Sequence, residues 1–266
     1  MRLSRPVKLV LGAIVVLALA FVYVPLAIVL VNSFNANQSL AWPPSALTTQ
    51  WWAAAAQSQG AWEAIGTSVL VAACATAIAL VLGTLVAIAL SRFEFFGKEA
   101  VNLLVVLPIA LPGIVTGIAL NNFFTTIAGV KLGLVTLILA HATFCIVTVY
   151  NNVLARMSRI NPNLGDAAAD LGADTFTTFW RVTFPQMRSA LLAGALLAFG
   201  LSFDEIIVTQ FTAGTGVTTL PIWIFENMFR PAQAPIVNVV AVVLVIASII
   251  PIWIAQRIAG KEALMK

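Results

Sequence analysis

The sequence contains very few charged residues. Asp, Glu, Lys and Arg together make up 9% of its 266 residues, whereas a soluble domain averages about 25%. Hydrophobic residues account for 61% of the chain, and the mean hydropathy is +1.01. An ordinary soluble domain is therefore excluded, and the composition predicts an integral membrane protein.

Cysteine is scarce, and a nucleotide-binding signature is missing. Cys74 and Cys145 lie in separate apolar stretches without CxxC spacing, so we interpret them as small packing residues rather than a disulfide or a metal site. The pattern GxxxxGK followed by Ser or Thr, which cradles nucleotide phosphates, does not occur. If ATP drives this protein, another chain must hydrolyse it.

Long uncharged runs fill most of the sequence. About 20 apolar residues are needed to cross a membrane as a helix, and lipid cannot satisfy the edge of an open sheet. The first run contains a signal-peptide-like Ala-Leu-Ala at 18–20, but uncharged sequence continues past it, so we interpret it as a retained span. We therefore predict an all-α, polytopic membrane protein with one domain, residues 1–266. Its six spans are residues 9–31, 64–91, 100–130, 132–155, 189–211 and 236–256.

Basic residues gather on one side of these spans. With a cytoplasmic N-terminus, twelve of the fourteen Lys and Arg fall in inner segments, and only Lys131 and Arg230 fall outside. The positive-inside rule then predicts that both termini are cytoplasmic. The charges alternate with spans instead of forming one basic face, so we expect no nucleic-acid partner. The inner residues are Arg2, Arg5, Lys8, Arg92, Lys98, Arg156, Arg159, Arg181, Arg188, Arg257, Lys261 and Lys266.

The first outer segment, from Asn32 to about Trp62, is polar and contains Pro43-Pro44. We expect a surface excursion that is long enough to touch a partner. Four tryptophans in it are typical of a membrane interface. They are Trp42, Trp51, Trp52 and Trp62.

The cytoplasmic stretch 156–188 is too long for a simple linker, and its capping residues predict two short helices across the mouth of the bundle. A helix should begin where an N-cap precedes a proline, and end at a glycine. The boundaries are Asn161 and Pro162 at the first start, Gly172 at its end, Asp174 at the second start and Pro185 at its end.

A longer pattern lies within this stretch. The chain reads Asp166-Ala167-Ala168-Ala169-Asp170-Leu171-Gly172-Ala173, followed by Phe179, Val182 and Phe184-Pro185. It resembles the EAA motif of ABC-importer permeases, in which Glu-Ala-Ala is followed after three residues by Gly and then by Ile-x-Leu-Pro. The spacing matches at every step, although Asp166 replaces Glu, Val182 replaces Ile and Phe184 replaces Leu.

The resemblance implies a type I ABC permease that is not itself an enzyme and moves solute by alternating access. It also implies a second homologous permease, an ATP-binding-cassette ATPase dimer that uses ATP and Mg, and an extracytoplasmic solute-binding protein, all at a bacterial plasma (inner) membrane in contact with lipid. We expect no cofactor on this chain. The alternative is an ordinary amphipathic helix that covers the bundle end. The residues implied in ATPase coupling are Asp166, Ala167, Ala168, Asp170, Leu171, Gly172, Ala173, Phe179 and Pro185.

Most of the chain also resembles the polyamine branch of these permeases, which carries spermidine and putrescine. The residues that carry this second resemblance are 201–208 (Leu-Ser-Phe-Asp-Glu-Ile-Ile-Val), Phe211, Gly214 and 219–223 (Thr-Leu-Pro-Ile-Trp). Related branches for 4-aminobutyrate, opines, aminophosphonate or ferric ion share parts of the same pattern. The resemblance therefore implies a small cationic solute, with those solutes as alternatives.

Asp204 and Glu205 are the only carboxylates inside a predicted span. An intramembrane charge costs about 2.5–3.5 kcal/mol on insertion scales and usually marks a pathway or a paired site. We expect at least one acid to contact a cationic solute. The alternative is a structural pair with a partner permease or with His141. A polar stripe with spacings of 3, 4 and 3 suits the wall of a wet cavity, and its members are Ser202, Glu205, Thr209 and Thr212.

Three further features have two interpretations each. His141 favours an interhelical hydrogen bond over a ligand or proton relay. A proline break in the third span could line the pathway or only bend the helix, and its residues are Pro108, Pro112 and Gly113. Glu226, beside Trp223 in the last outer loop, could meet an amine or anchor the interface.

The sequence gives weak support to two other classes of protein. Gly200-Leu201-Ser202 together with His141 faintly suggests an intramembrane serine protease, but a nucleophile needs a hydrogen-bonded base, and that class does not explain the EAA-like segment. A secondary carrier or channel would need no ATPase.

Overall fold

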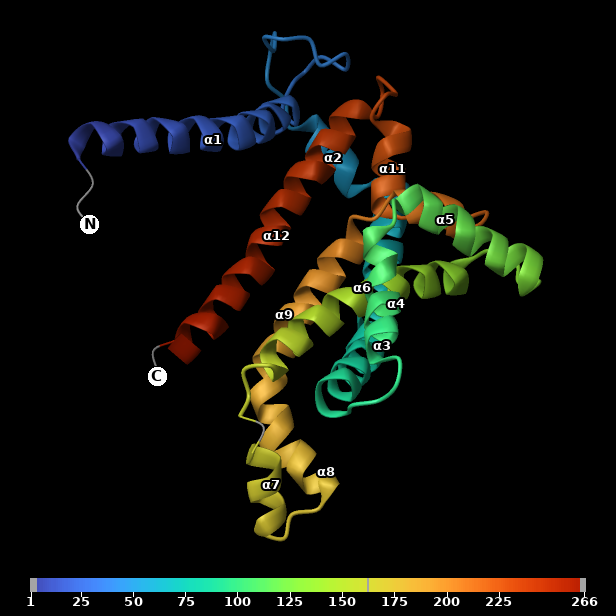
Figure 1. The fold of residues 1–266 in the computed structure, drawn as a ribbon. Helices are drawn as coiled ribbons and strands as arrows, with labels where there is room; N and C mark the ends of the chain where they lie inside the picture. Colours follow the sequence, from blue (N-terminus) through green and yellow to red (C-terminus); the bar gives the residue numbers. More distant parts are fainter. Residues whose placement is uncertain (1–3, 162, 264–266) are drawn as a thin grey trace. The chain divides into compact units, whose positions relative to one another are not determined.

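The structure is a computed structural model that describes residues 4–161 and 163–263. Three of the residues named above, Arg2, Pro162 and Lys266, lie outside the described residues. Apart from loops and one isolated bridge between Asn35 and Leu47, the described backbone is helical, so the all-α prediction is confirmed. In chain order the elements are α1 (Arg5–Asn32), α2 (Gln50–Ala56), α3 (Gln59–Arg92), α4 (Lys98–Ala110), α5 (Gly113–Asn122), the π-helix η1 (Phe123–Ile127), α6 (Leu134–Met157), α7 (Asn163–Asp170), α8 (Thr175–Thr178), the π-helix η2 (Phe179–Thr183), α9 (Phe184–Phe203), α10 (Ile207–Thr212), α11 (Leu220–Asn227) and α12 (Ala234–Ala263) (Figure 1).

Four helical stretches are long and apolar enough to cross a membrane, namely α1, α3, α6 and the stretch Thr175–Phe203. A fifth span results if α4 is joined to the following helix. The sixth predicted window overlaps α12, whose apolar stretch among the described residues is the shorter Ala234–Ile249. Six windows were predicted, and the described residues contain four or five spans by this test.

The third predicted span is broken where its prolines predict a break. α4 ends at Ala110, Leu111 is extended with ψ 144° before Pro112, and α5 begins at Gly113. The two halves are bent by 106°. Proline removes an N–H and pushes the residue before it out of the helical region, which explains the break.

The fifth predicted span is not one helix, which corrects the sequence analysis. α9 ends at Phe203, Asp204 is its C-cap, and α10 begins only at Ile207. The other end differs as well. Pro185 does not stop a short helix but lies in the first turn of α9, after the π turn η2. A proline is tolerated in a first turn because its missing N–H would have little to bond.

The described residues divide into two compact units. One takes up the chain as far as Ala61 and then Ile224–Trp253, and the other takes up Trp62–Trp223 and the residues after Trp253. In the first unit, α1 has no buried residue. The outer segment after it is held by a side-chain bond, because Trp51 is buried and its indole Nε1–H donates to the Asn35 carbonyl at 2.8 Å.

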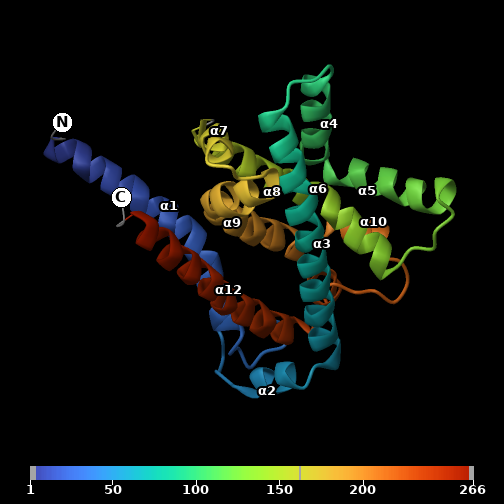
Figure 2. The same cartoon turned by 90° about the horizontal axis from the view of Figure 1, so that it is seen from below.

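In the second unit, α6 packs along α9 and also contacts α4 and α10. Small residues let these helices approach one another, as is common in membranes. A Cβ on Gly83 of α3 would lie 2.8 Å from the Ile146 carbonyl of α6, and one on Gly194 of α9 would lie 3.3 Å from Val149 Cα. α5 lies beside α10 (Figure 2). The core of this unit therefore centres on α6.

Candidate functional site

The break between α9 and α10 carries the two carboxylates that the sequence analysis predicts inside a span, Asp204 and Glu205. The Asp204 N–H donates to the Gly200 carbonyl at 3.2 Å and so closes the last turn of α9. One Glu205 carboxylate oxygen accepts the Val208 N–H at 2.9 Å, which caps the start of α10. Within residues 4–161 and 163–263, the Asp204 carboxylate has neither a hydrogen bond nor an ion pair, and it is exposed.

A hollow of about 440 Å³ opens beside this break. The last carbonyls of α9 carry the partial negative charge of a helix C-terminus, and the two carboxylates add to it. The other lining is aliphatic, so the hollow suits a cation with an apolar body. The lining residues are Leu196, Leu197, Gly200, Leu201, Asp204 and Glu205.

His141 makes the interhelical hydrogen bonds that the sequence predicts. Its Nδ1 lies 2.8 Å from Ser202 Oγ on α9, and its Nε2 lies 2.9 Å from Thr209 Oγ1 on α10. The alternative in which His141 pairs with one of the acids is wrong, because both ring nitrogens are bonded to hydroxyls.

The polar stripe on α9 and α10 lies inside the second unit rather than facing water. Ser202, Thr209 and Thr212 are all buried, and Thr212 Oγ1 donates back to the Val208 carbonyl at 2.8 Å. In this conformation the hydroxyls serve packing, and a place for Ser202 and Thr209 in a solute pathway stays a prediction. Glu205 is half-buried and borders the hollow.

Ser202 and His141 have the spacing of a nucleophile and its base, which sequence reasoning did not expect. They are only 3% and 1% exposed, however, and the second ring nitrogen of His141 bonds Thr209 rather than an acid. No substrate could reach the serine in this arrangement, so the geometry does not support a protease.

Trp223 and Glu226 lie on a short helix, α11, within the connection that was predicted as the last outer loop. Trp223 is buried and Glu226 is exposed. Their contact with a solute stays a prediction. Among the described residues, no group of three His, Cys, Asp or Glu side chains could hold a metal ion. Cys145 is buried in the core, and Cys74 is half-buried.

The EAA-like segment forms an exposed helix with a tight turn after it. α7 runs from Asn163 to Asp170, and Gly172 has φ +80°. The Gly172 N–H donates to the Ala169 carbonyl at 2.8 Å, and the Ala173 N–H donates to the Ala168 carbonyl at 3.0 Å. These two bonds form a Schellman motif, in which glycine adopts the left-handed conformation. The predicted stop at Gly172 is therefore confirmed.

The predicted second start at Asp174 is also confirmed. Its carboxylate accepts the Thr177 N–H at 2.8 Å and caps α8. Hydrogen bonding to Thr177 lowers the pKa of the Asp174 carboxyl, because the bonds favour the charged form. The turn is therefore closed by a glycine on one side and a charged cap on the other.

Large apolar side chains project from this segment. Leu171 is 89% exposed, Phe176 is 69% exposed and Trp180 is 48% exposed. Trp180 also contacts Phe176 and Phe184, with ring centroids 6.2 and 5.0 Å apart. Exposed apolar groups beside a polar helix are typical of a surface that another protein or a membrane covers.

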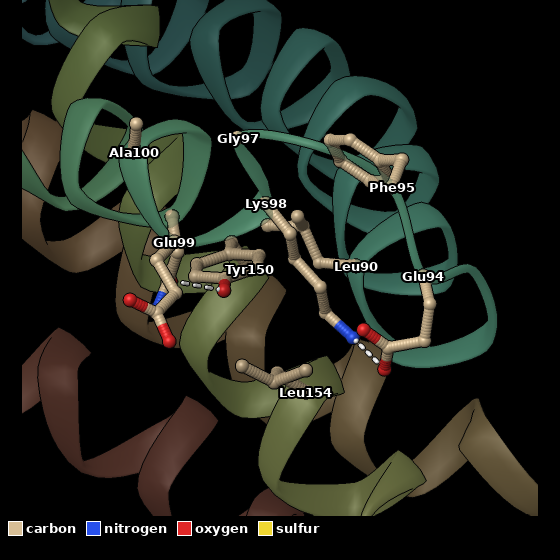
Figure 3. A pocket seen from close by; sticks show the side chains of 10 residues that line it. Leu90, Glu94, Phe95, Gly97, Lys98, Glu99, Ala100, Tyr150 and Leu154 are labelled. Carbon is tan, nitrogen blue, oxygen red and sulfur yellow. Dashed lines mark hydrogen bonds and ion pairs between the residues drawn. The ribbon is translucent and has the colours of Figure 1, made fainter.

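A second hollow, of about 720 Å³, lies between the α3–α4 connection and α6 (Figure 3). The Lys98 ammonium pairs with the Glu94 carboxylate at 2.7 Å, and the Tyr150 hydroxyl donates to Asn102 Oδ1 at 2.6 Å. Sequence reasoning missed this hollow and its ion pair, because Glu94 lies in the non-helical connection before α4, where the helical i, i+4 pairing rule does not apply.

Comparison with known proteins gives concordant results. The family model of binding-protein-dependent transport system inner membrane components matches residues 79–261. The chain is 32% identical over 235 residues to the putrescine transport system permease protein PotI of Escherichia coli (strain K12), covering 86% of this chain and 83% of that protein. It is 31% identical over 253 residues to the spermidine/putrescine transport system permease protein PotC of the same strain, covering 95% and 94%. The crystal structure of a bacterial ABC transporter involved in the import of alginate shares the fold, with a TM-score of 0.75, 14% identity, and coverage of 97% of this chain and 99% of that one.

Proposed function

The chain belongs to the binding-protein-dependent transport system inner membrane components, the permeases of ABC importers, and from this membership we propose that it carries small aliphatic amines of the polyamine class. It is a multi-pass membrane protein and an ABC-importer permease. Family membership removes the carrier, channel and protease alternatives. We extend this proposal to the partners of the chain, its orientation in the membrane and the roles of its residues.

The observation that carries the proposal is the break in the fifth span. Asp204 stands there without a partner among the described residues, at the C-terminal end of α9 and beside an aliphatic hollow. At about 4 Å and an effective dielectric near 20, one carboxylate attracts a monocation by about 4 kcal/mol. Discontinuous helices of this kind hold cations in other transporters.

The aliphatic lining favours amines over the alternatives. A diamine presents ammonium groups for Asp204 and Glu205 and a methylene chain for Leu197 and Leu201. Ferric ion would need several oxygen ligands at once. A 4-aminobutyrate, opine or aminophosphonate would bring an anionic group, and the hollow has no basic side chain to receive it. The relatives PotI and PotC are named as putrescine and spermidine/putrescine permeases, which also supports an amine as the solute.

The segment around α7 is the proposed contact with the ATPase. The exposed carboxylates of Asp166 and Asp170 and the exposed Leu171 form one surface, and the Schellman turn at Gly172 gives it a fixed shape. Because α8, η2 and α9 follow as one helical stretch, Thr175–Phe203, a push on this segment can pass directly to the break at Asp204.

The remaining partners follow from the family. The chain works with a second permease, an ATPase dimer that hydrolyses ATP with Mg and an extracytoplasmic solute-binding protein, in the bacterial inner membrane among lipids. Both termini are cytoplasmic, which places the α6–α9 connection inside. Closure of the ATPases drives alternating access by rotation of the helical bundles.

Uptake competition tests the proposed solute. Cells that express the complete importer take up labelled putrescine, and we expect unlabelled putrescine and spermidine to compete while 4-aminobutyrate does not. Strong competition by 4-aminobutyrate and none by spermidine would contradict the amine assignment.

A further inference from the structure

The two ends of the helix break are tied to a single side chain on α6. Ser202 lies in the last turn of α9, and Thr209 lies in the first turn of α10. Both hydroxyls bond the His141 ring, at 2.8 and 2.9 Å. Residues 204–206 between these ends are not helical. Their backbone bonds to the helices are the terminal ones, from the Asp204 N–H to the Gly200 carbonyl at 3.2 Å and from the Gln210 N–H to the Ile206 carbonyl at 3.0 Å.

The donors and acceptors of this network can be assigned. The Thr209 hydroxyl donates to the Glu205 carbonyl at 2.7 Å, so its oxygen accepts from His141 Nε2–H. The other ring nitrogen, Nδ1, then accepts from the Ser202 hydroxyl. A neutral imidazole satisfies every group in this chain of bonds. The chain ends on the backbone of Glu205, one of the two candidate solute-binding acids.

Neighbouring contacts of α6 lack this bridging geometry. The Cys145 thiol donates to the Ala198 carbonyl of α9 at 3.4 Å, and the Thr136 hydroxyl bonds the Thr212 carbonyl of α10 at 2.9 Å. Each of these contacts reaches only one side of the break. His141 reaches both, and its ring is 1% exposed, so it does not line the hollow itself.

We propose that His141 is a positioning residue that clasps α9 and α10 across the break and so fixes the Asp204–Glu205 segment for solute contact. We call His141, Ser202 and Thr209 together the clasp. Buried networks with every group bonded hold one geometry, because each lost bond leaves an unsatisfied polar atom. The benefit to transport rests on the proposed function; the geometry of the clasp does not.

The first experiment measures the geometry without any solute. Spin labels at Leu197 and Gln210, both exposed, report the distance across the break in the complete importer. The labels require a Cys74→Ala, Cys145→Ala background that is first shown to transport. We expect Thr209→Val to broaden the distance distribution, and Thr209→Ser, which keeps the hydroxyl, to preserve it.

Two further variants test whether the broadening comes from loss of the His141 bonds. His141→Phe keeps a ring but removes both bonds, and should broaden the distribution as Thr209→Val does. Thr136→Val removes a hydrogen bond between α6 and α10 that does not bridge the break, and should leave it narrow. An unchanged distribution in Thr209→Val, or an equal broadening in Thr136→Val, would overturn the clasp.

The second experiment measures transport in the same variants. We expect Thr209→Val to lower putrescine uptake about tenfold, as the loss of buried hydrogen bonds allows, while basal ATP hydrolysis persists and Thr209→Ser transports normally. A broadened break with normal uptake and normal solute preference would support the clasp and contradict the proposed solute contact. The two proposals therefore fail in different ways.

Discussion

The turn at Gly172 allows a prediction that separates backbone conformation from side-chain size. The two effects rank the same substitutions in opposite orders. Gly172 has φ +80°, and a Cβ added there would meet no atom within 4 Å. Gly172→Ala therefore pays only the cost of a left-handed backbone, about 1–2 kcal/mol. Asn adopts this conformation more readily than Ala, so Gly172→Asn should cost roughly half as much despite its larger side chain.

These energies predict how far each variant weakens binding to the ATPase. If the turn shapes the surface that meets the ATPase, 1–2 kcal/mol corresponds to an affinity loss of about 5- to 30-fold for Gly172→Ala. The assay measures ATPase binding to the purified permease pair and ATP-driven uptake at equal membrane abundance. Gly172→Asp shares its shape with Gly172→Asn and adds a charge, so it isolates electrostatic effects and should uncouple transport while the spans assemble.

The order of the variants in ATPase binding and uptake shows which effect governs coupling. We expect Gly172→Ala to bind the ATPase more weakly and to show less ATP-driven uptake than Gly172→Asn. The opposite order would show that bulk at the interface, and not the left-handed turn, governs coupling. Wild-type uptake in all three variants, Gly172→Asp included, would refute the docking role of this segment.

Three other expectations follow from the structure. Single cysteines at Trp52 and Gln233 should react with an impermeant reagent added to intact cells, and one at Asp170 should not. Labelling of position 170 from outside would contradict the predicted topology. Gly83→Ala should reduce the thermal stability of the purified chain, because its Cβ would lie 2.8 Å from an α6 carbonyl, and an unchanged melting temperature would contradict this packing. Hydrogen bonding lowers the Asp174 pKa, so its cap should stabilise α8 at neutral pH and be lost as the pH falls below about 4; Asp174→Asn should remove that pH dependence of amide exchange, and a retained dependence would exclude the cap as its source.

The sequence predicts the features that depend on local signals. Apolar runs predict most of the spans, and the prolines before Gly113 predict a break in the third one, which the structure shows as a bend of 106°. Glycine and Asp signals correctly place the turn between α7 and α8. Each of these depends on a residue whose backbone preference dominates its neighbours.

Other features depend on contacts between helices, which periodicity cannot show. The break after Phe203 has no proline or glycine within it, so the fifth span looked continuous. The hydroxyls of Ser202 and Thr209 form a polar stripe, but the stripe alone cannot tell water from His141 on a neighbouring helix. Pro185 looked like a stop because the π turn before it, η2, has no sequence signature.

One measurement tests the central claim most directly, namely uptake of labelled putrescine by proteoliposomes that contain the complete importer with Asp204→Asn or Glu205→Gln. Both variants keep size and hydrogen bonding while removing charge. We expect Asp204→Asn to have the larger defect, because Glu205 also caps α10, while the loaded binding protein still stimulates ATP hydrolysis. Normal rate and affinity in both variants would show that the acids are structural, and would contradict a cation site at the helix break.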